Sequence, residues 1–347
     1  MFKIYLTGVI LSFIFSVFLV PFSNFLAKKF GIYDRPSKRK LKYRKLTRWA
    51  GFGMFLAFFL SLVVLIKIFP ELKDILNYKY TIDWEEYKET ISISKQLLGI
   101  FFASLLVVIV GSIDDKFGLS AGVKFLFQVI TAYCAIDYGV RILGITFPFN
   151  DRFIAFPRII SQIVTIIWLC SFMNMINLID GIDGLAGGIV LISSFAFFII
   201  SVLQQQMISS IISNQLILSS LLSLILCGTV GGFLVYNFYP AKLFMGDTGA
   251  LFLGLLVGCI TTVGTLKTGA LLSFVIPVII AGVPFLDVAM TIIRRIKKKV
   301  SIGLADRHHI HHILLSYGWT EREVVLFFYV ISLFLSIISI SILALRR

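Results

Sequence analysis

The sequence predicts an all-α integral membrane protein with about ten transmembrane helices. Of its 347 residues, 58% are hydrophobic and 14% are charged, whereas a soluble domain is about 45–50% apolar. The mean hydropathy is +0.96, and apolar runs of roughly 18 or more residues recur along the chain. None of these runs alternates as a barrel strand does, so the spans should be helices.

We expect the spans to form a single polytopic domain over residues 1–347. The first span lacks a small-residue cleavage site, so it should be retained and not removed as a signal peptide. The four cysteines stand singly within apolar runs and should be small buried hydrophobes. The expected spans are 4–26, 51–69, 97–113, 122–138, 159–176, 186–203, 216–235, 249–266, 270–292 and 324–345.

The distribution of charge predicts the orientation. Residues 28–48 carry ten Lys/Arg and one Asp, and residues 294–307 carry six Lys/Arg and one Asp. The loop 67–95 has nearly equal numbers of basic and acidic residues, five and six. Basic loops stay in the cytoplasm, so the two basic loops should be cytoplasmic and both termini should lie outside. This bias explains the net charge of +14 without a nucleic-acid partner.

Four polar side chains recur at every third residue between the fifth and sixth expected spans: Asn174, Asn177, Asp180 and Asp183. A carboxylate at mid-bilayer costs about 2.5–3.5 kcal/mol, so these residues should lie at a span end, facing water or a cation. Glycines between and after them allow the backbone to turn. A polar helix cap is the structural alternative.

Two adjacent carboxylates, Asp114 and Asp115, follow the third expected span. Adjacent carboxylates repel each other unless a cation or a proton lies between them, although a solvated turn would also accommodate the pair. Lys124 lies at the start of the fourth span, where its ammonium could hold a phosphate as a point charge.

The loop between the seventh and eighth expected spans contains Asn237, Phe244 and Asp247. Asp247 opens a helix, where the helix dipole favours an anion, so a helix cap is again the structural alternative. Under the expected topology, all these clusters share the cytoplasmic side. Their pooled carboxylates suit Mg²⁺ or Mn²⁺, with positions left for substrate phosphates. The carboxylates are Asp114, Asp115, Asp180, Asp183 and Asp247.

All four histidines lie between Asp306 and His312, after the basic run 294–299. We expect this loop to bind a diphosphate; a zinc site on His308 and His312, which are one helical turn apart, is the alternative. Carboxylates for a cation, cationic groups for phosphates and apolar helices together indicate phosphoryl transfer at the membrane interface, between a phosphorylated lipid and a soluble diphosphate.

These residues resemble those of the polyprenyl-phosphate N-acetylhexosamine-1-phosphate transferases (glycosyltransferase family 4). The resemblance covers nearly the whole chain, in the family's order. It lies in Asp114-Asp115 with Gly118-Leu119-Ser120, in 174–184, in 244–249 and in the histidines 308–312.

The resemblance implies Mg²⁺-dependent transfer of a sugar-1-phosphate from a UDP-sugar to undecaprenyl phosphate, with release of UMP, in the bacterial plasma membrane. It implies metal-binding roles for Asn177 and Asp247, and a lipid-phosphate role for Asp114 and Asp115. The expected catalytic residues are Asp114, Asp115, Asp183 and Asp247. The expected substrate-binding residues are Lys124, Asn174, Asp180, Asn237, Phe244, Arg307, His308, His309, His311 and His312.

The histidine loop distinguishes branches of the family. The phospho-N-acetylmuramoyl-pentapeptide transferases typically have three consecutive histidines followed by Phe-Glu, whereas this chain has His311-His312-Ile313-Leu314. It therefore resembles the undecaprenyl-phosphate N-acetylglucosaminyl 1-phosphate transferases, and the pentapeptide transferase is the alternative. A cation- or proton-coupled transporter is the alternative from another class. A homodimer is compatible with the sequence.

Overall fold

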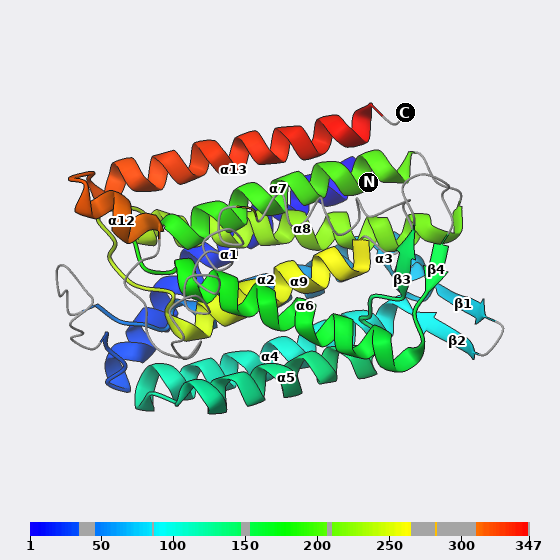
Figure 1. The fold of residues 1–347 in the computed structure, drawn as a ribbon, viewed down its shortest axis with the longest axis horizontal. Coiled ribbons are helices and arrows are strands. Elements are labelled where there is room, and N and C mark those ends of the chain that lie inside the picture. The colour runs from blue at the N-terminus through cyan, green and yellow to red at the C-terminus, as the bar shows by residue number, and fades with distance from the viewer. Residues whose placement is uncertain are drawn as a thin grey trace, which may run out of the picture.

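The computed structural model describes residues 1–34, 46–84, 87–146, 153–206, 210–264, 282 and 310–345. They form a bundle of long helices that run along one axis (Figure 1). The long helices are α1 (Phe2–Lys29), α2 (Ala50–Ile68), α4 (Ile93–Phe117), α5 (Ala121–Asp137), α6 (Arg158–Ile179), α7 (Leu185–Gln205), α8 (Ser210–Asn237), α9 (Gly246–Gly264) and α13 (Glu321–Ala344); the short helices are α3 (Glu71–Leu76) and α12 (Ile310–Ser316).

Eight of these helices are long and apolar enough to cross a membrane, so the protein is a multi-pass membrane protein. The helix at the expected span 122–138 is α5, which has 17 residues and is not among the eight. The expected span 270–292 lies outside the described residues except for position 282. The expected count of ten spans therefore stays a prediction.

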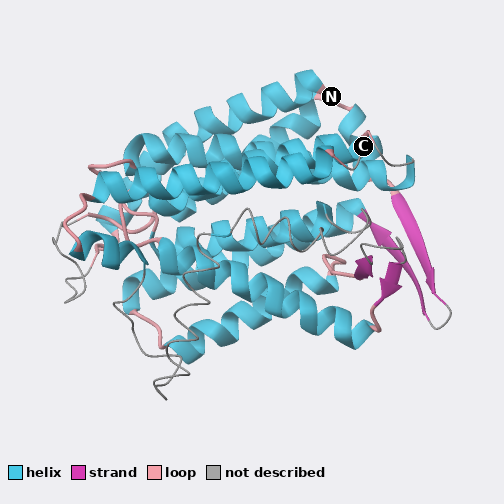
Figure 2. Cartoon of the chain, turned by 45° about the horizontal axis from the view of Figure 1, so that its top comes forward, coloured by secondary structure: helices cyan, strands magenta, loops and turns pink. Residues whose placement is uncertain are grey.

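The prediction of an all-α chain missed two small antiparallel hairpins. Strand β1 (Lys79–Trp84) pairs with β2 (Tyr87–Ser92) from Lys79↔Ser92 to Trp84↔Tyr87, and β3 (Gly144–Thr146) pairs with β4 (Phe153–Ala155). Residues 80–84 are rich in aromatic and β-branched side chains, which favour strands. Figure 2 shows both hairpins at the same end of the helices.

The bundle has two chemically different ends. Both termini and both hairpins lie at one end, whereas α12 and the first turn of α13 lie at the other (Figure 1). The last turns of α4 and α6 and the first turns of α5, α7 and α9 lie at this second end, because consecutive helices run in opposite directions. The polar clusters of the sequence therefore meet at one end of the molecule.

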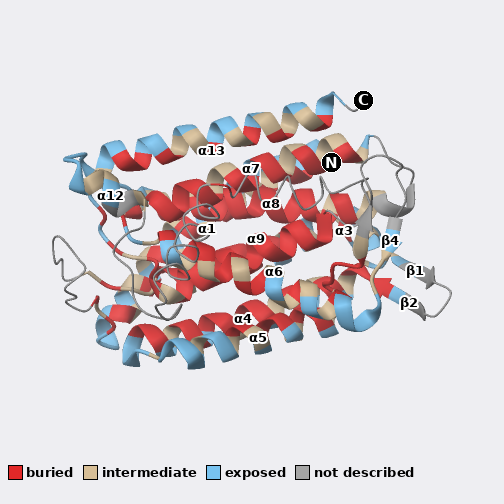
Figure 3. Cartoon of the chain, in the orientation of Figure 1, coloured by how far each residue is buried: buried red, intermediate tan, exposed pale blue. Residues whose placement is uncertain are grey.

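Helix α9 occupies the centre of the bundle. In its membrane-spanning window 94% of the residues are buried, compared with 28% in α13, and Figure 3 shows α9 buried along almost its whole length. Two glycines allow neighbouring helices to reach its backbone. A Cβ on Gly51 of α2 would lie 2.2 Å from the Gly249 nitrogen, and a Cβ on Gly111 of α4 would lie 2.5 Å from the Thr248 Cα. The start of α9 is thus held between α2 and α4.

Candidate active site

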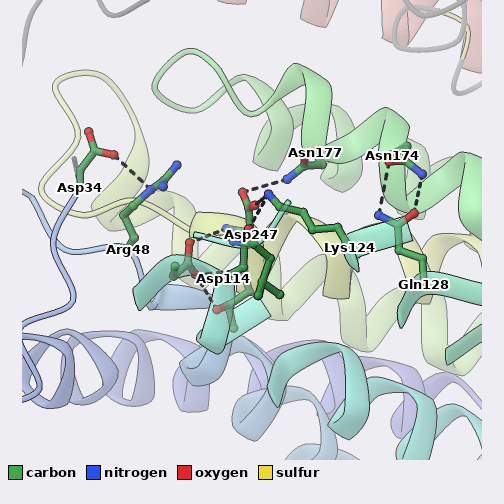
Figure 4. Close-up of polar contacts among 11 residues, drawn as sticks. Asp34, Arg48, Asp114, Lys124, Gln128, Asn174, Asn177 and Asp247 are labelled. Carbon is green, nitrogen blue, oxygen red and sulfur yellow. Dashed lines mark hydrogen bonds and ion pairs between the residues drawn. The ribbon is translucent and has the colours of Figure 1, made fainter. Parts of the chain in front are cut away.

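The candidate site lies where four helices end or begin. Asp114 comes from the last turn of α4, Lys124 from the first turn of α5, Asn177 from the last turn of α6 and Asp247 from the first turn of α9. Figure 4 shows these side chains directed toward one another. Residues up to 133 positions apart in the sequence are therefore brought to one point by the antiparallel order of the helices.

The ammonium group of Lys124 lies between two carboxylates from different helices. It forms ion pairs with Asp247 and with Asp114, at 2.5 Å between Nζ and Oδ2 in the second case. Asn177 donates a hydrogen bond from Nδ2 to Oδ1 of Asp247, 3.1 Å away. The Lys124 side chain is 26% exposed, and those of Asp247 and Asp114 are 15% and 5% exposed. Two carboxylates thus converge on one positively charged point that solvent can reach.

This arrangement fits a magnesium ion. Mg²⁺ is usually bound through one or two carboxylates, while water and substrate phosphates fill its remaining positions. Asp114 and Asp247 already face one cationic group, and Asn177 has an amide oxygen that rotation about χ2 would bring toward the same point. Among the described residues, no three or more His, Cys, Asp or Glu side chains are grouped so that they could hold a metal ion together. Two carboxylates and one amide oxygen would leave coordination positions for water or substrate.

Asp115 has different surroundings from its neighbour. Its Oδ1 accepts a hydrogen bond from the Asp247 nitrogen at 2.9 Å, and its Oδ2 accepts bonds from the Thr248 nitrogen at 3.1 Å and the Thr248 hydroxyl at 2.6 Å. The side chain is buried. A carboxylate at this position satisfies free N–H groups at the start of α9 and interacts favourably with the helix dipole. Asp115 therefore holds the first turn of α9, which carries Asp247.

Asp183 and Asn237 join two loops of the site. Asp183 Oδ2 accepts a hydrogen bond from the Ala241 nitrogen at 2.9 Å. Asn237 Oδ1 accepts one from the Gly184 nitrogen at 3.0 Å, and its Nδ2 donates to the Leu243 oxygen at 3.0 Å. Both side chains are buried. They connect the turn after α6 to the segment that leads to Phe244 and Asp247.

The turn 180–184 is also supported by α13. Gly184 has a φ of +80°, a conformation that favours glycine. Tyr329 of α13 donates its hydroxyl hydrogen to the Gly184 oxygen at 2.6 Å. Asp180 follows the last residue of α6 directly, and so it begins this turn at the same end of the bundle.

Asn174 does not contact Lys124 or Asp247 in the described hydrogen bonds but pairs with Gln128 of α5. Asn174 Nδ2 donates to Gln128 Oε1 at 2.6 Å, and Gln128 Nε2 donates to Asn174 Oδ1 at 3.3 Å. Figure 4 shows this amide pair to one side of Lys124. Gln128 lies one helical turn after Lys124, so the pair fixes α5 against α6 next to the site.

Arg307, His308 and His309 lie outside the described residues. The backbone at His311 and His312 forms the first turn of α12, and α12 lies at the same end of the bundle as the start of α9 (Figure 1). The expected diphosphate-binding role of this loop, and the zinc alternative, remain predictions.

Arg48 and Asp34 belong to the site region, although the sequence analysis assigned Arg48 only to a basic cytoplasmic loop. Arg48 Nε lies 3.1 Å from Asp34 Oδ1. Burial acts to lower the pKa of the Arg48 guanidinium, but attraction by Asp115, Asp247, Asp34 and Asp180 outweighs it and raises this pKa above its usual value. The only sequence signal was a basic residue immediately before an apolar run.

Comparison with known proteins identifies the family. The family model described as "Glycosyl transferase family 4" matches residues 97–265. A Bacillus subtilis protein named "Probable undecaprenyl-phosphate N-acetylglucosaminyl 1-phosphate transferase" is 35% identical over 336 residues, which cover 95% of this chain and 83% of the relative. The chain belongs to glycosyl transferase family 4. The resemblance seen in the sequence is thereby confirmed.

Two further relatives align along most of the chain. A Mycolicibacterium smegmatis protein named "Decaprenyl-phosphate N-acetylglucosaminephosphotransferase" is 30% identical over 91% of this chain and 76% of its own length. A Bacillus subtilis protein named "Phospho-N-acetylmuramoyl-pentapeptide-transferase" is 28% identical over 96% of this chain and 95% of its own length. Membership of glycosyl transferase family 4 makes this protein an enzyme, which argues against the transporter alternative. The segment that the family model matches contains Asp114, Lys124, Asn177 and Asp247.

Proposed function

We propose that this protein transfers N-acetylglucosamine-1-phosphate from UDP-N-acetylglucosamine to undecaprenyl phosphate and releases UMP. The reaction would take place at the cytoplasmic face of a bacterial plasma membrane, as the first membrane step of a cell-envelope polysaccharide pathway. The names of the relatives at 35% and 30% identity support an N-acetylglucosamine donor. The observation that carries the proposal is the convergence of Asp114 and Asp247 on one cationic point.

The site residues have distinct roles in this proposal. Asp247 and Asn177 would hold Mg²⁺, and Asp114 faces the same cationic point. When bound, Mg²⁺ screens the charge of the donor diphosphate, so that an anionic acceptor can approach the phosphorus. With a divalent cation neutralising the two carboxylates, the ammonium of Lys124 would be able to bind a phosphate oxygen. Asp114 would receive the proton of a protonated acceptor phosphate.

We favour direct displacement over a covalent aspartyl intermediate. An oxygen of the acceptor phosphate forms a bond to the phosphorus next to the sugar, while the bridging P–O bond to UMP breaks. Asp114 and Asp247 both face a cationic group, and this arrangement suits the holding of a cation better than attack on phosphorus. Asp115 binds the start of α9 through both of its oxygens, so it would act by holding Asp247 in place.

The test is a donor panel with purified protein, undecaprenyl phosphate and Mg²⁺. We expect lipid product and UMP with UDP-N-acetylglucosamine, and no product with UDP-N-acetylgalactosamine or UDP-N-acetylmuramoyl-pentapeptide. Excess chelator, or the substitution Asp247→Ala, should lower turnover at least about a hundredfold, as loss of one strong electrostatic contact in a transition state does. Asp137→Ala, on the exposed far end of α5, is the matched control.

The pentapeptide transferase is the second candidate, since a protein of that name aligns with 96% of this chain at 28% identity. Product from UDP-N-acetylmuramoyl-pentapeptide alone would assign the protein to that branch and leave the reaction class intact. Activity that survives excess chelator would contradict the metal part of the proposal.

A further inference from the structure

The segment immediately before α2 lies against the segment immediately before α9. The Phe244 nitrogen donates to the Thr47 oxygen at 2.9 Å, and the Ala50 nitrogen donates to the Phe244 oxygen at 3.4 Å. Arg48 and Phe244 form an isolated parallel β-bridge. The backbone of Arg48 is therefore fixed next to the residues that lead to Asp247, although the proposed mechanism gives Arg48 no role.

The neighbours of Arg48 are bound to other helices. The Thr47 hydroxyl donates to Asn24 Oδ1 of α1, and the Trp49 indole N–H donates to the Ser112 hydroxyl of α4 at 2.6 Å. In an extended segment, successive side chains point to opposite sides. Since Thr47 and Trp49 are engaged by α1 and α4, the Arg48 side chain points away from these two contacts, and Figure 4 shows it between Asp34 and Asp247.

Asp34 sets the orientation of the Arg48 side chain. Its side chain is only 1% exposed, whereas that of Arg48 is 30% exposed, and the ion pair runs through Nε of Arg48. A guanidinium is planar and rigid and has five N–H groups. An ion pair at Nε therefore fixes the plane of the guanidinium, while the two Nη groups lie at the tip of the side chain. Figure 4 shows Asp34 on one side of Arg48 and Asp247 on the other.

The carboxylates near Arg48 would repel a substrate phosphate. Five carboxylates lie in this region, namely Asp34, Asp114, Asp115, Asp180 and Asp247, and Arg48 interacts electrostatically with four of them. The ammonium of Lys124 already faces Asp114 and Asp247. A phosphate that approaches such an acidic surface is repelled unless cations face it, and a guanidinium can bind two phosphate oxygens at once.

We propose that Arg48 is a phosphate-binding residue of the active site. Its ion pair with Asp34 holds the guanidinium in orientation, and the Nη groups of Arg48 bind oxygens of a substrate phosphate. The inference rests on the proposed function, because it requires a phosphorylated substrate beside Asp247. The phosphate belongs either to the donor diphosphate or to the polyprenyl phosphate, and the kinetic experiment separates the two. The competing role is structural: neutralisation of nearby carboxylates and attachment of the 46–50 segment to Asp34.

The experiment compares Arg48→Lys and Arg48→Gln with wild type. We expect Arg48→Lys, which keeps the charge but loses the planar fork, to raise the KM of one substrate at least about tenfold, as loss of one hydrogen bond to a charged group does. Arg48→Gln should raise this KM further. It should also lower Tm, because the buried Asp34 carboxylate loses its ion pair with Arg48, so both KM values are measured well below the Tm of the variant. Titration of UDP-N-acetylglucosamine and of undecaprenyl phosphate, each at saturating partner, shows which phosphate is bound. Arg322→Gln, an exposed arginine on α13, is the matched control and should change neither KM.

A binding measurement keeps this test independent of turnover. Mg²⁺ with UDP, or with undecaprenyl phosphate in detergent, should raise the Tm of wild type, and the shift for one of the two should be lost in Arg48→Gln. If wild type is inactive with every donor but still shows an Arg48-dependent shift, the assignment of Arg48 stands and the proposed reaction fails. If wild type is active and the Arg48 variants keep both KM values and both shifts, the reaction stands and Arg48 has the structural role.

Discussion

Asp114 and Asp115 are adjacent and chemically identical, yet the structure surrounds them differently. Asp114 faces the ammonium of Lys124 and accepts one hydrogen bond from the Leu119 nitrogen at 2.5 Å, within its own turn. Asp115 instead binds two backbone N–H groups and a hydroxyl at the start of α9. Replacing each aspartate in turn by asparagine should therefore distinguish a residue that takes part in the chemistry from one that positions Asp247.

We expect Asp114→Asn to lower turnover at least about a hundredfold and to lower Tm less than Asp115→Asn does, because the amide oxygen of asparagine can still accept the hydrogen bond from the Leu119 nitrogen. Asp115→Asn should lower Tm as well as turnover, because a buried charged acceptor of three hydrogen bonds is lost, at a cost of about 1–3 kcal/mol. Initial rates with UDP-N-acetylglucosamine and thermal unfolding in detergent measure both effects. Equal losses of Tm in the two variants would contradict the different assignments.

At the scale of elements, the position of the site depends on how closely α4 approaches α9. A Cβ on Gly111 would lie 2.5 Å from the Thr248 Cα and 2.8 Å from its nitrogen, and both are backbone atoms that cannot rotate away. Gly122, in the first turn of α5, has no atom within 4 Å of an added Cβ. The two glycines are thus a matched pair near the same site.

We expect Gly111→Ala to destabilise the protein by about 1–3 kcal/mol, the usual cost of overpacking, and to lower turnover because the start of α9 moves away from Asp115. Gly122→Ala should leave both unchanged or slightly raise the Tm, because alanine favours a helix over glycine. Thermal unfolding and initial rates of the two variants provide the measurement. If Gly111→Ala leaves both Tm and turnover unchanged, the close approach of α4 to α9 does not determine the position of Asp247.

At the scale of the whole molecule, the two ends of the bundle should face different compartments. The site lies at the end opposite both termini (Figure 1). Lys116, at the end of α4, and Lys73, in α3, are both exposed and lie at opposite ends. The positive-inside rule predicts that the end with Lys116 faces the cytoplasm.

In a background without the native cysteines, we expect Lys73→Cys to react with an impermeant thiol reagent applied to intact cells. Lys116→Cys should react only after the membrane is permeabilised. The native residues to replace are Cys134, Cys170, Cys227 and Cys259, none of which forms a disulfide. Labelling of Lys116→Cys from outside would reverse the orientation and contradict a cytoplasmic active site.

The sequence by itself determined the class of protein, the eight described spans to within a few residues, and the end of the bundle at which the polar residues meet. These features depend on the length of apolar runs and on loop charge, and both can be read locally. The sequence also indicated the family. The described structure leaves 307–309 of the histidine loop and most of the expected span 270–292 as predictions.

Only the tertiary structure decided which polar residues bind other parts of the protein and which converge on one point. The partners of Asp115 are 132 and 133 positions away, Asn174 pairs with a residue 46 positions away, and the orientation of Arg48 depends on Asp34 and on Phe244. A side chain's role depends on which groups share its surroundings. In a helical bundle those groups come from distant turns, whose rotation and depth are set by packing such as that at Gly51 and Gly111.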